Sequence, residues 1–349
     1  MPVTTNFLER MILLRLNQGP GPFLDLFGAM AFKAVSTALE LDIFEALSGG
    51  PLTPEELGRR IKASERGTVL LLKALDAIGY VEKQDGRYAN TPMTIKWMLR
   101  SSPKCISSGF SHLENILEQW DYLGEAIRRG ETPKLAWEWL DQHPTGWEDY
   151  NAAMMATARM ADDEIIVKVK LPPTARRLLD VGGGHGLHAI NFCHRYPDLS
   201  ATVMDWPQAR EVAEATIAAE GMGDRVSFRE CDFCTDDLGS GYDVALLFNI
   251  IHMYPPDKNI KLLRKVSGAL NPGTTQVIIL DQMALKASGP LAKAVAGLSG
   301  LDLFVEVNGQ TYRPDEVTGW LEQADFIDAR AILLRKTPGF ALAVGTRTG

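Results

Sequence analysis

Two kinds of hydrophobic pattern divide the chain, and the change falls near residue 176. Before that point, most apolar residues recur at the three- and four-residue spacing of amphipathic helices. After it, short runs rich in valine, isoleucine and leucine alternate with helical stretches. Such alternation is typical of βαβ units, which form a parallel sheet with right-handed crossovers. The pattern therefore predicts a helical N-terminal part followed by an α/β domain.

Residues 22–102 form the first predicted unit. Its order of helices followed by a hairpin is that of a winged helix. The local signals are a helical pattern over residues 23–47, a stop at 48–50, a capping box at 53–56, a capped helix over 64–79 and a hairpin turn at 84–86.

The charge of this unit argues against DNA, which winged helices often bind. Residues 22–102 contain ten acidic and ten basic side chains, and the whole chain has a formal net charge of −8. A domain that reads a DNA groove needs a basic surface. We therefore expect no nucleic-acid partner, and we expect the unit to pair two subunits in a homodimer.

Residues 103–170 are predicted to be helical and contain four of the seven tryptophans. Packing between helices is the simplest explanation of these aromatics and of the nearby methionines. They could also form an adaptable wall over a flat apolar ligand. The candidate substrate residues, including one from later in the chain, are Phe110, Trp120, Met155 and Met253.

Seven strands are expected in the second half of the chain. They cover residues 177–181, 201–205, 225–230, 243–249, 275–282, 329–334 and 340–346. Only five residues separate the last two strands, so they should form an antiparallel hairpin. We expect a parallel sheet whose last strand is reversed.

Three features of the chain bear on its location. No run approaches the ~18 apolar residues of a membrane span, and four cysteines are too few for a disulfide framework. The charged N-terminal segment does not resemble a secretory signal. We expect a cytoplasmic protein without a membrane partner.

Residues 178–186 read LLDVGGGHG, a buried strand that runs into a glycine loop. Gly182 and Gly184 allow a tight turn and a close approach of the backbone to a ligand. The dinucleotide fingerprint would need a sixth-position glycine, where this chain has Leu187. Asp180 disfavours a pyrophosphate but suits a cationic sulfonium with an amino group. The loop alone is weak evidence, but it favours S-adenosylmethionine over a dinucleotide as cofactor.

Acidic residues also end the next two strands. Asp205 can accept hydrogen bonds from both ribose hydroxyls, and Asp232 from an adenine amino group. Phe233 can pack on the adenine ring. Ligands of open parallel sheets bind at these carboxyl ends. Trp206, beside Asp205, and Asn249, after the fourth strand, complete the predicted cofactor site.

His252 follows the fourth strand and would lie over the cofactor crevice, where it could act as a general base. A lone histidine is more often structural, so the pattern alone leaves both interpretations open. Cys231 and Cys234 have redox spacing, and His185 and His188 could join a metal site. A single cysteine pair is a weak signal and no third ligand is apparent. We expect no metal.

Five blocks of the chain together resemble the plant-type and bacterial small-molecule O-methyltransferases, a family that includes caffeate and acetylserotonin methyltransferases. The blocks are LLDVGGGHG, VMDWPQ, ECDF, NIIHMYPPDK and GQTYRPDEVTGWLEQADF. The resemblance implies a winged-helix dimerisation domain (1–102), a helical linker or substrate cap (103–170) and a methyltransferase domain (171–349). That last domain should have a Rossmann-like, seven-stranded sheet.

The resemblance also implies roles for single residues. The family histidine that matches His252 removes a proton from the acceptor hydroxyl, and acids matching Asp205 and Asp232 hold ribose and adenine. One of two glutamates that orient the histidine aligns with Asp281. We therefore expect methyl transfer from S-adenosylmethionine to a hydroxyl of a small metabolite.

Two departures from the family pattern keep other reactions open. The family commonly has Asp-Trp after the histidine, whereas this chain has Met253-Tyr254, and no carboxylate stands near residues 310–312 for the second glutamate. An imidazole with less acidic support is a weaker base. The alternatives are S- or C-methylation and, more remotely, a non-enzymatic winged-helix regulator, against which the neutral helix over residues 65–78 argues.

Overall fold

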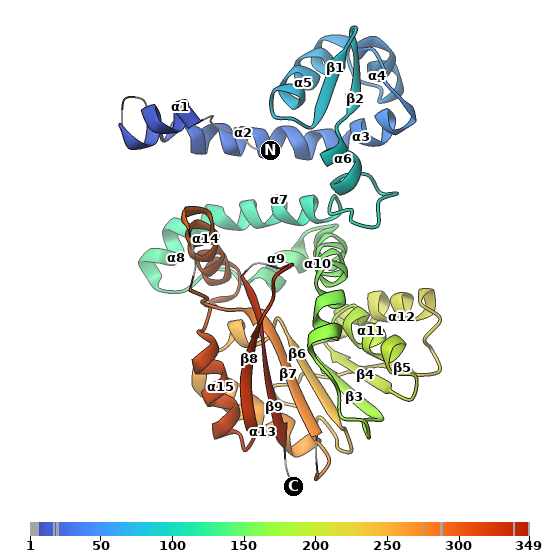
Figure 1. The fold of residues 1–349 in the computed structure, drawn as a ribbon, viewed down its shortest axis with the longest axis vertical. Coiled ribbons are helices and arrows are strands. Elements are labelled where there is room, and N and C mark those ends of the chain that lie inside the picture. The colour runs from blue at the N-terminus through green and yellow to red at the C-terminus, as the bar shows by residue number, and fades with distance from the viewer. Residues whose placement is uncertain are drawn as a thin grey trace. The chain divides into compact units, whose positions relative to one another are not determined.

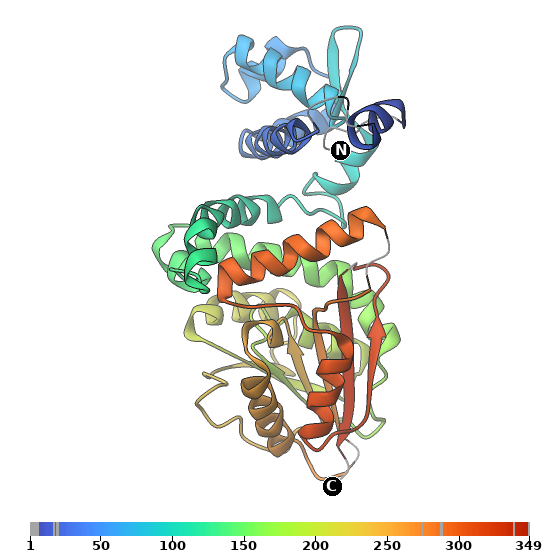
Figure 2. The same ribbon diagram turned by 90° about the vertical axis from the view of Figure 1, so that its left-hand side faces the viewer.

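The computed structural model describes residues 7–16, 18, 21–273, 275–286, 289–337 and 339–347. They form two compact units, Met1–Glu114 and Asn115–Gly349, drawn in Figure 1 and turned by 90° in Figure 2. The division at residues 102/103 and 170/171 stays a prediction. None of the helices within these ranges is long and apolar enough to cross a membrane.

The first unit consists of helices and one hairpin, in the predicted order. Its elements are α1 (Phe7–Arg10), η1 (Met11–Arg15), α2 (Phe23–Glu40), α3 (Ile43–Ala46), η2 (Leu47–Gly49), α4 (Pro54–Arg60), α5 (Glu65–Ala77), β1 (Val81–Gln84), β2 (Arg87–Asn90) and α6 (Pro92–Trp97). Apolar residues of α2 to α5 and of the hairpin, such as Phe44, Leu57 and Leu72, form its core. Helix α7 (Gly109–Gln119) crosses into the second unit.

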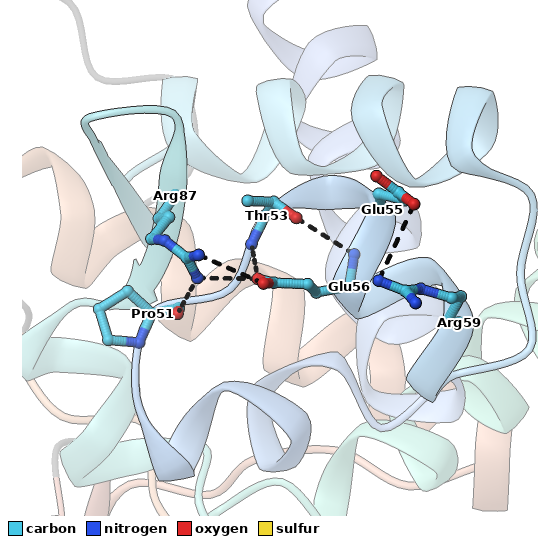
Figure 3. Close-up of polar contacts among 6 residues, drawn as sticks. All are labelled: Pro51, Thr53, Glu55, Glu56, Arg59 and Arg87. Carbon is cyan, nitrogen blue, oxygen red and sulfur yellow. Dashed lines mark hydrogen bonds and ion pairs between the residues drawn. The ribbon is translucent and has the colours of Figure 1, made fainter.

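The capping box predicted at the start of α4 is confirmed. The hydroxyl of Thr53 accepts from the Glu56 amide at 3.2 Å, and the Glu56 carboxylate accepts from the Thr53 amide at 2.8 Å. Arg87 of the hairpin donates to the same carboxylate, so the cap also ties β2 to α4 (Figure 3). This bond links local helix initiation to the tertiary structure of the unit.

One predicted element of the first unit is wrong. The helical pattern over residues 23–47 is divided, because α2 ends at Glu40 and Asp42 has a left-handed φ of 56°. Aspartate tolerates this conformation better than most residues. The chain therefore turns before α3, although the apolar spacing continues through the break.

The second unit begins with four helical segments and continues with the sheet. The helical segments are η3 (Trp120–Tyr122), α8 (Leu123–Arg129), α9 (Ala136–Gln142) and α10 (Gly146–Lys168). The strands are β3 (Arg177–Val181), β4 (Ser200–Asp205), β5 (Val226–Glu230), β6 (Val244–Phe248), β7 (Thr275–Gln282), β8 (Ile327–Leu333) and β9 (Phe340–Arg347). Between them lie α11 (Leu187–Arg195), η4 (Pro207–Ala209), α12 (Arg210–Ala219), η5 (Ile251–Met253), α13 (Pro256–Ala269), α14 (Pro290–Val307) and α15 (Pro314–Gln323).

The seven strands form one sheet in the order β5-β4-β3-β6-β7-β9-β8. Pairs from β5 through β7 are parallel, whereas β9 is antiparallel to both β7 and β8. The predicted sheet with a reversed last strand is confirmed. The structure adds that β9 lies inside the sheet and that β8 forms its edge.

Helices cover both faces of the sheet, as Figure 1 shows with α11 and α12 beyond one side and α13 and α15 beyond the other. Alternate strand residues enter different cores: Leu178 packs with α11, and Leu179 packs with α13. This explains why the strands read as continuous apolar runs. Because β3, β4, β5 and β6 are parallel, the segments after them emerge at one edge, where ligands bind in such sheets.

Candidate active site

The glycine loop between β3 and α11 has a backbone that only glycine fits well. Gly182 and Gly184 have φ angles of 67° and 49°, in the left-handed region. A β-carbon at Gly182 would lie 2.3 Å from Cδ1 of Ile250, and one at Gly183 would lie 2.6 Å from Cγ of Asp180. Packing from both sides therefore fixes the loop directly before the first turn of α11.

Asp205, the last residue of β4, is bound to this loop. Its Oδ2 accepts from the Gly184 amide at 2.7 Å, and its Oδ1 accepts from the Trp206 amide at 2.7 Å. Burial raises the pKa of Asp205, while these two amide bonds act in the opposite direction. An ionised carboxylate has about four lone-pair positions, so two stay available for ligand hydroxyls. The neighbouring Trp206 ring meets Trp137 edge-on at 5.6 Å.

Asp180 lies beneath the loop, on the face of the sheet covered by α11. It is 1% exposed, and neither of its oxygens has a hydrogen-bond partner among the described residues. The Ala189 amide is close enough to lower its pKa without meeting hydrogen-bond geometry. Burial, reinforced by Asp205 and opposed by His188, raises the pKa of Asp180 to about 7. A buried carboxyl without donors is rare and calls for a functional explanation.

The other predicted cofactor residues follow the parallel strands β5 and β6. Asp232 lies just beyond the end of β5, and its Oδ1 accepts from the Cys234 amide at 2.9 Å. Phe233 is buried, with its ring 3.2 Å from the position of a β-carbon on Gly182. Asn249 follows β6 with a left-handed φ of 57°. The structure thus brings Phe233 to the loop and places Asp232 beside it in the chain.

His252, which follows β6, forms an ionisable pair with Asp281. His252 lies in η5, just after β6, and its Nδ1 is 2.7 Å from Oδ1 of Asp281 in β7. The His252 backbone amide donates to the other oxygen of Asp281 at 3.3 Å. The histidine side chain is 11% exposed and the aspartate side chain is fully buried. One carboxylate therefore holds both the ring and the backbone of His252.

The segment expected to supply a second carboxylate instead supports His252 through its backbone. The Gln310 amide donates to the His252 carbonyl at 3.0 Å. A β-carbon on Gly309 would lie 2.6 Å from that carbonyl oxygen, so the two segments touch. The Tyr312 hydroxyl donates to the Tyr254 carbonyl at 2.7 Å. These contacts fix the η5 segment without adding an acid.

Sequence reasoning missed an acidic and aromatic group carried by α10 and α14. Burial raises the pKa of Tyr150, and the charges of Asp205 and Glu306 add to the effect. Burial also raises the pKa of Glu306 to about 8, reinforced by Asp302. The Trp120 indole donates to Asp302 at 2.6 Å. The available signal was a pair of acids four residues apart within the apolar run LDLFVEV.

The remaining substrate candidates lie on different elements. Met155 is half-buried on α10. Met253, the last residue of η5, packs against the hydrophobic core. Phe110 belongs to the first unit, where its ring stacks on Phe32 at 5.7 Å. Their contact with a substrate stays a prediction.

The residues considered for a metal site have other surroundings. Cys231 is buried and Cys234 is exposed, with its sulfur 3.3 Å from the Tyr254 hydroxyl. His188 pairs with Asp162. Within the described ranges, no group of three or more His, Cys, Asp or Glu residues is placed to hold a metal ion.

Comparison with known proteins shows the family of the chain. Residues 120–327 match the model of the O-methyltransferase domain, and residues 24–101 match that of the O-methyltransferase dimerisation domain. The chain is 30% identical over 313 residues to 3-hydroxy-5-methyl-1-naphthoate 3-O-methyltransferase of Streptomyces sahachiroi, covering 87% of this chain and 88% of that one.

Two further comparisons show how widely the fold is used. The chain is 26% identical to L-tyrosine C(3)-methyltransferase of Streptomyces lavendulae, covering 77% of this chain and 76% of that one. It is similar in fold to human N-acetylserotonin methyltransferase, solved in complex with S-adenosylmethionine, with a TM-score of 0.82, 21% identity and full coverage of both chains. On the strength of both family models and of the naphthoate-methylating relative, the chain belongs to the O-methyltransferase family.

Proposed function

We propose that this protein methylates a hydroxyl group of a small aromatic metabolite, with His252 as the general base. The methyl donor is S-adenosylmethionine, which supplies an activated methyl group when bound. The observation that carries the proposal is the hydrogen-bonded pair of His252 and Asp281. His252 follows Ile250 by two residues, and the Ile250 side chain packs on the glycine loop. A base therefore stands next to the loop expected to hold the donor.

The residues at the loop fit this donor. The Asp205 carboxylate can still accept hydrogen bonds from the two ribose hydroxyls. Asp232 could accept a hydrogen bond from the adenine amino group, and Phe233 could pack on the adenine ring. Asp180 has a buried carboxyl without hydrogen-bond donors directly under the loop. When ionised, this carboxylate would favour the positively charged end of the donor through the thin layer of glycine backbone. Trp206, directly after β4, and Asn249, directly after β6, would border this site.

The role of the base follows from the tautomer that Asp281 selects. A buried carboxylate accepts from Nδ1–H of His252, which leaves the lone pair of Nε2 free to take a proton. His252 would remove the acceptor hydroxyl proton as the oxygen attacks the donor methyl. The other contributions of the protein are alignment of the two reactants and exclusion of water. Asp281 also holds the backbone of His252, which offsets in part the absence of a second carboxylate.

The acceptor class rests on the wall of α10 and α14 and on the relatives. Aromatic and thioether side chains such as Trp120, Tyr150 and Met155 suit a flat ring, and Glu306 offers a polar contact. The Streptomyces sahachiroi relative acts on a hydroxynaphthoate. Methylation at carbon is the second candidate, because one relative carries out that reaction and the chain lacks the second carboxylate.

We also propose that the protein is a homodimer formed through its first unit. Four large apolar side chains of α2 are about half exposed, namely Phe23, Leu26, Phe27 and Met30. Such a patch is typical of a protein–protein interface. The cytoplasmic location stays a prediction based on the small number of cysteines.

Replacing His252 by alanine tests the proposal directly. We expect kcat for a hydroxylated aromatic acceptor to fall by about 100-fold or more, the usual contribution of a general base. The dissociation constant of S-adenosylhomocysteine should stay within about twofold of wild type, since Asp205 and the loop are untouched. A variant that keeps most of its O-methylating activity would refute the base role.

A further inference from the structure

A buried ionic contact joins α10 to α11, apart from the donor and base residues. Oδ1 of Asp162 on α10 lies 2.5 Å from Nδ1 of His188 in the first turn of α11. The other oxygen of Asp162 accepts from the side-chain amide of Asn191. Asp162 and His188 are only 5% and 7% exposed. Both oxygens of one α10 carboxylate are therefore used to hold the helix that follows the glycine loop.

His188 is enclosed by elements of the donor site. Its ring packs edge-on against Phe248, the last residue of β6, with centroids 4.8 Å apart. The titratable groups that face it are Asp162 from α10, Asp180 from β3 and His185 from the loop, whose ring centroid is 5.7 Å away. The contact from β6 is uncharged. His188 is thus hydrogen-bonded to Asp162, and Asp180 acts on it only through its charge.

The charges around His188 explain why loss of either partner of its contact with Asp162 should be costly. Burial by itself lowers the pKa of His188, but Asp162 and Asp180 outweigh it, so the pKa of His188 is raised. Breaking one partner of a buried ion pair leaves the other charge uncompensated in a poorly solvated site. Loss of His188 would leave the Asp162 carboxylate buried without this partner, close to the glycine loop.

Helix α10 also borders the donor site upstream of the contact. Tyr150 lies close enough to Asp205 for its ionisation to depend on that carboxylate, and the Met154 backbone interacts with His185 of the loop. A shift of α10 would therefore move the acceptor wall and loosen the loop together. We propose that His188, held by Asp162, is a positioning residue that fixes α10 against the donor loop. This inference rests on the proposed donor site.

The test measures donor affinity separately from turnover. We would titrate the full-length protein with S-adenosylhomocysteine and determine kcat and the acceptor KM for His188→Gln and Asp162→Asn. His194→Gln is the matched control, because His194 is on the same helix but forms an exposed pair with Glu220 at 3.6 Å. Asn191→Ala serves as a milder variant that removes only one of the contacts to Asp162.

Both substitutions in the ion pair should raise the dissociation constant of S-adenosylhomocysteine and the acceptor KM by about tenfold, with kcat within threefold of wild type. The variant with both substitutions, His188→Gln and Asp162→Asn, should bind S-adenosylhomocysteine no more weakly than the weaker-binding single variant, because the two residues act as a unit. Unchanged affinity in all three variants at Asp162, His188 and Asn191, with only a lower melting temperature, would overturn the proposal. If wild type itself bound no S-adenosylhomocysteine, the proposed function would fail instead, and that result is distinguishable.

Discussion

The contact between Asp281 and His252 concentrates the support of the base in one carboxylate. Asp281 contacts both the ring and the backbone amide of the histidine, and it is fully buried. Asparagine has nearly the same shape but lacks the charge, and its amide can present a donor to Nδ1. Ring orientation and tautomer should both become less well defined.

We therefore expect Asp281→Asn to lower kcat by about 10- to 100-fold, the range found when a hydrogen-bonded support of a functional histidine is lost. The dissociation constant of S-adenosylhomocysteine should change little. Steady-state kinetics and calorimetric titration of the same preparation provide both values. A kcat equal to that of wild type would show that Asp281 does not orient a base.

The raised pKa of Glu306 should make the folded protein less stable as the pH rises. Its folded pKa of about 8 is well above its ordinary value of 4.5. Between these pH values the unfolded chain releases a proton that the folded chain keeps, so the free energy of unfolding falls as pH rises. Glu306→Gln removes this loss.

The melting temperature of the variant minus that of wild type should therefore be about 3 °C or more higher at pH 8 than at pH 5. Thermal unfolding at both pH values measures this difference. Glu211→Gln, at an exposed position, is the control, and its difference in melting temperature from wild type should be the same at both pH values. A constant difference for Glu306→Gln as well would mean that the carboxyl is ionised in the folded protein.

At the same scale, some site residues could be predicted and others could not. Asp205 and His252 were identifiable because the ends of parallel strands meet at one edge, whatever the details of packing. Tyr150 and Glu306 come from helices, and their approach to Asp205 depends on how α10 and α14 pack. Helical spacing places a residue on a face of its own helix, but it does not specify the neighbour of that face.

The glycine loop is the element on which donor binding depends most. Gly182 combines a left-handed φ of 67° with a neighbour 2.3 Å from any β-carbon, so alanine meets backbone strain and a clash with Ile250. We expect Gly182→Ala to weaken S-adenosylhomocysteine binding by at least about tenfold. Gly268→Ala is the control, because that helical position has open space and should leave binding unchanged. Equal affinity of the two variants would contradict the role of the loop.

Elements were predictable where local chemistry and tertiary context agree. Strand β7 lies at its predicted residues, because its run of apolar residues is buried on both faces. The break at Asp42 was not predictable, since the apolar spacing continues through residues 41–47. Nor did the chain order reveal that β9 enters between β7 and β8, because this depends on pairing partners distant in sequence.

At the scale of the whole molecule, the central question is assembly. The exposed apolar side chains of α2 should be covered by a second copy in the homodimer. Phe27→Glu combined with Met30→Glu would place two charges in that interface and should yield monomers. Sedimentation should give twice 38.4 kDa for wild type and 38.4 kDa for the double variant. Glu40→Gln, at an exposed end of the same helix, should stay dimeric.

A monomeric wild type would contradict the assignment of this surface. A double variant that kept the dimeric mass would show that the interface lies elsewhere in the chain. Neither result would affect the donor site, whose described residues all belong to the second unit.

The most direct test of the account is the identity of the atom that receives the methyl group. Wild-type protein would be incubated with S-adenosylmethionine carrying a labelled methyl group and with hydroxylated aromatics, thiols and keto acids in parallel. Mass spectrometry and NMR of the products would locate the label. We expect a labelled methyl ether on a hydroxylated aromatic, formed by wild type and greatly reduced in His252→Ala. Label found only on carbon or sulfur, undiminished by the His252 substitution, would contradict it.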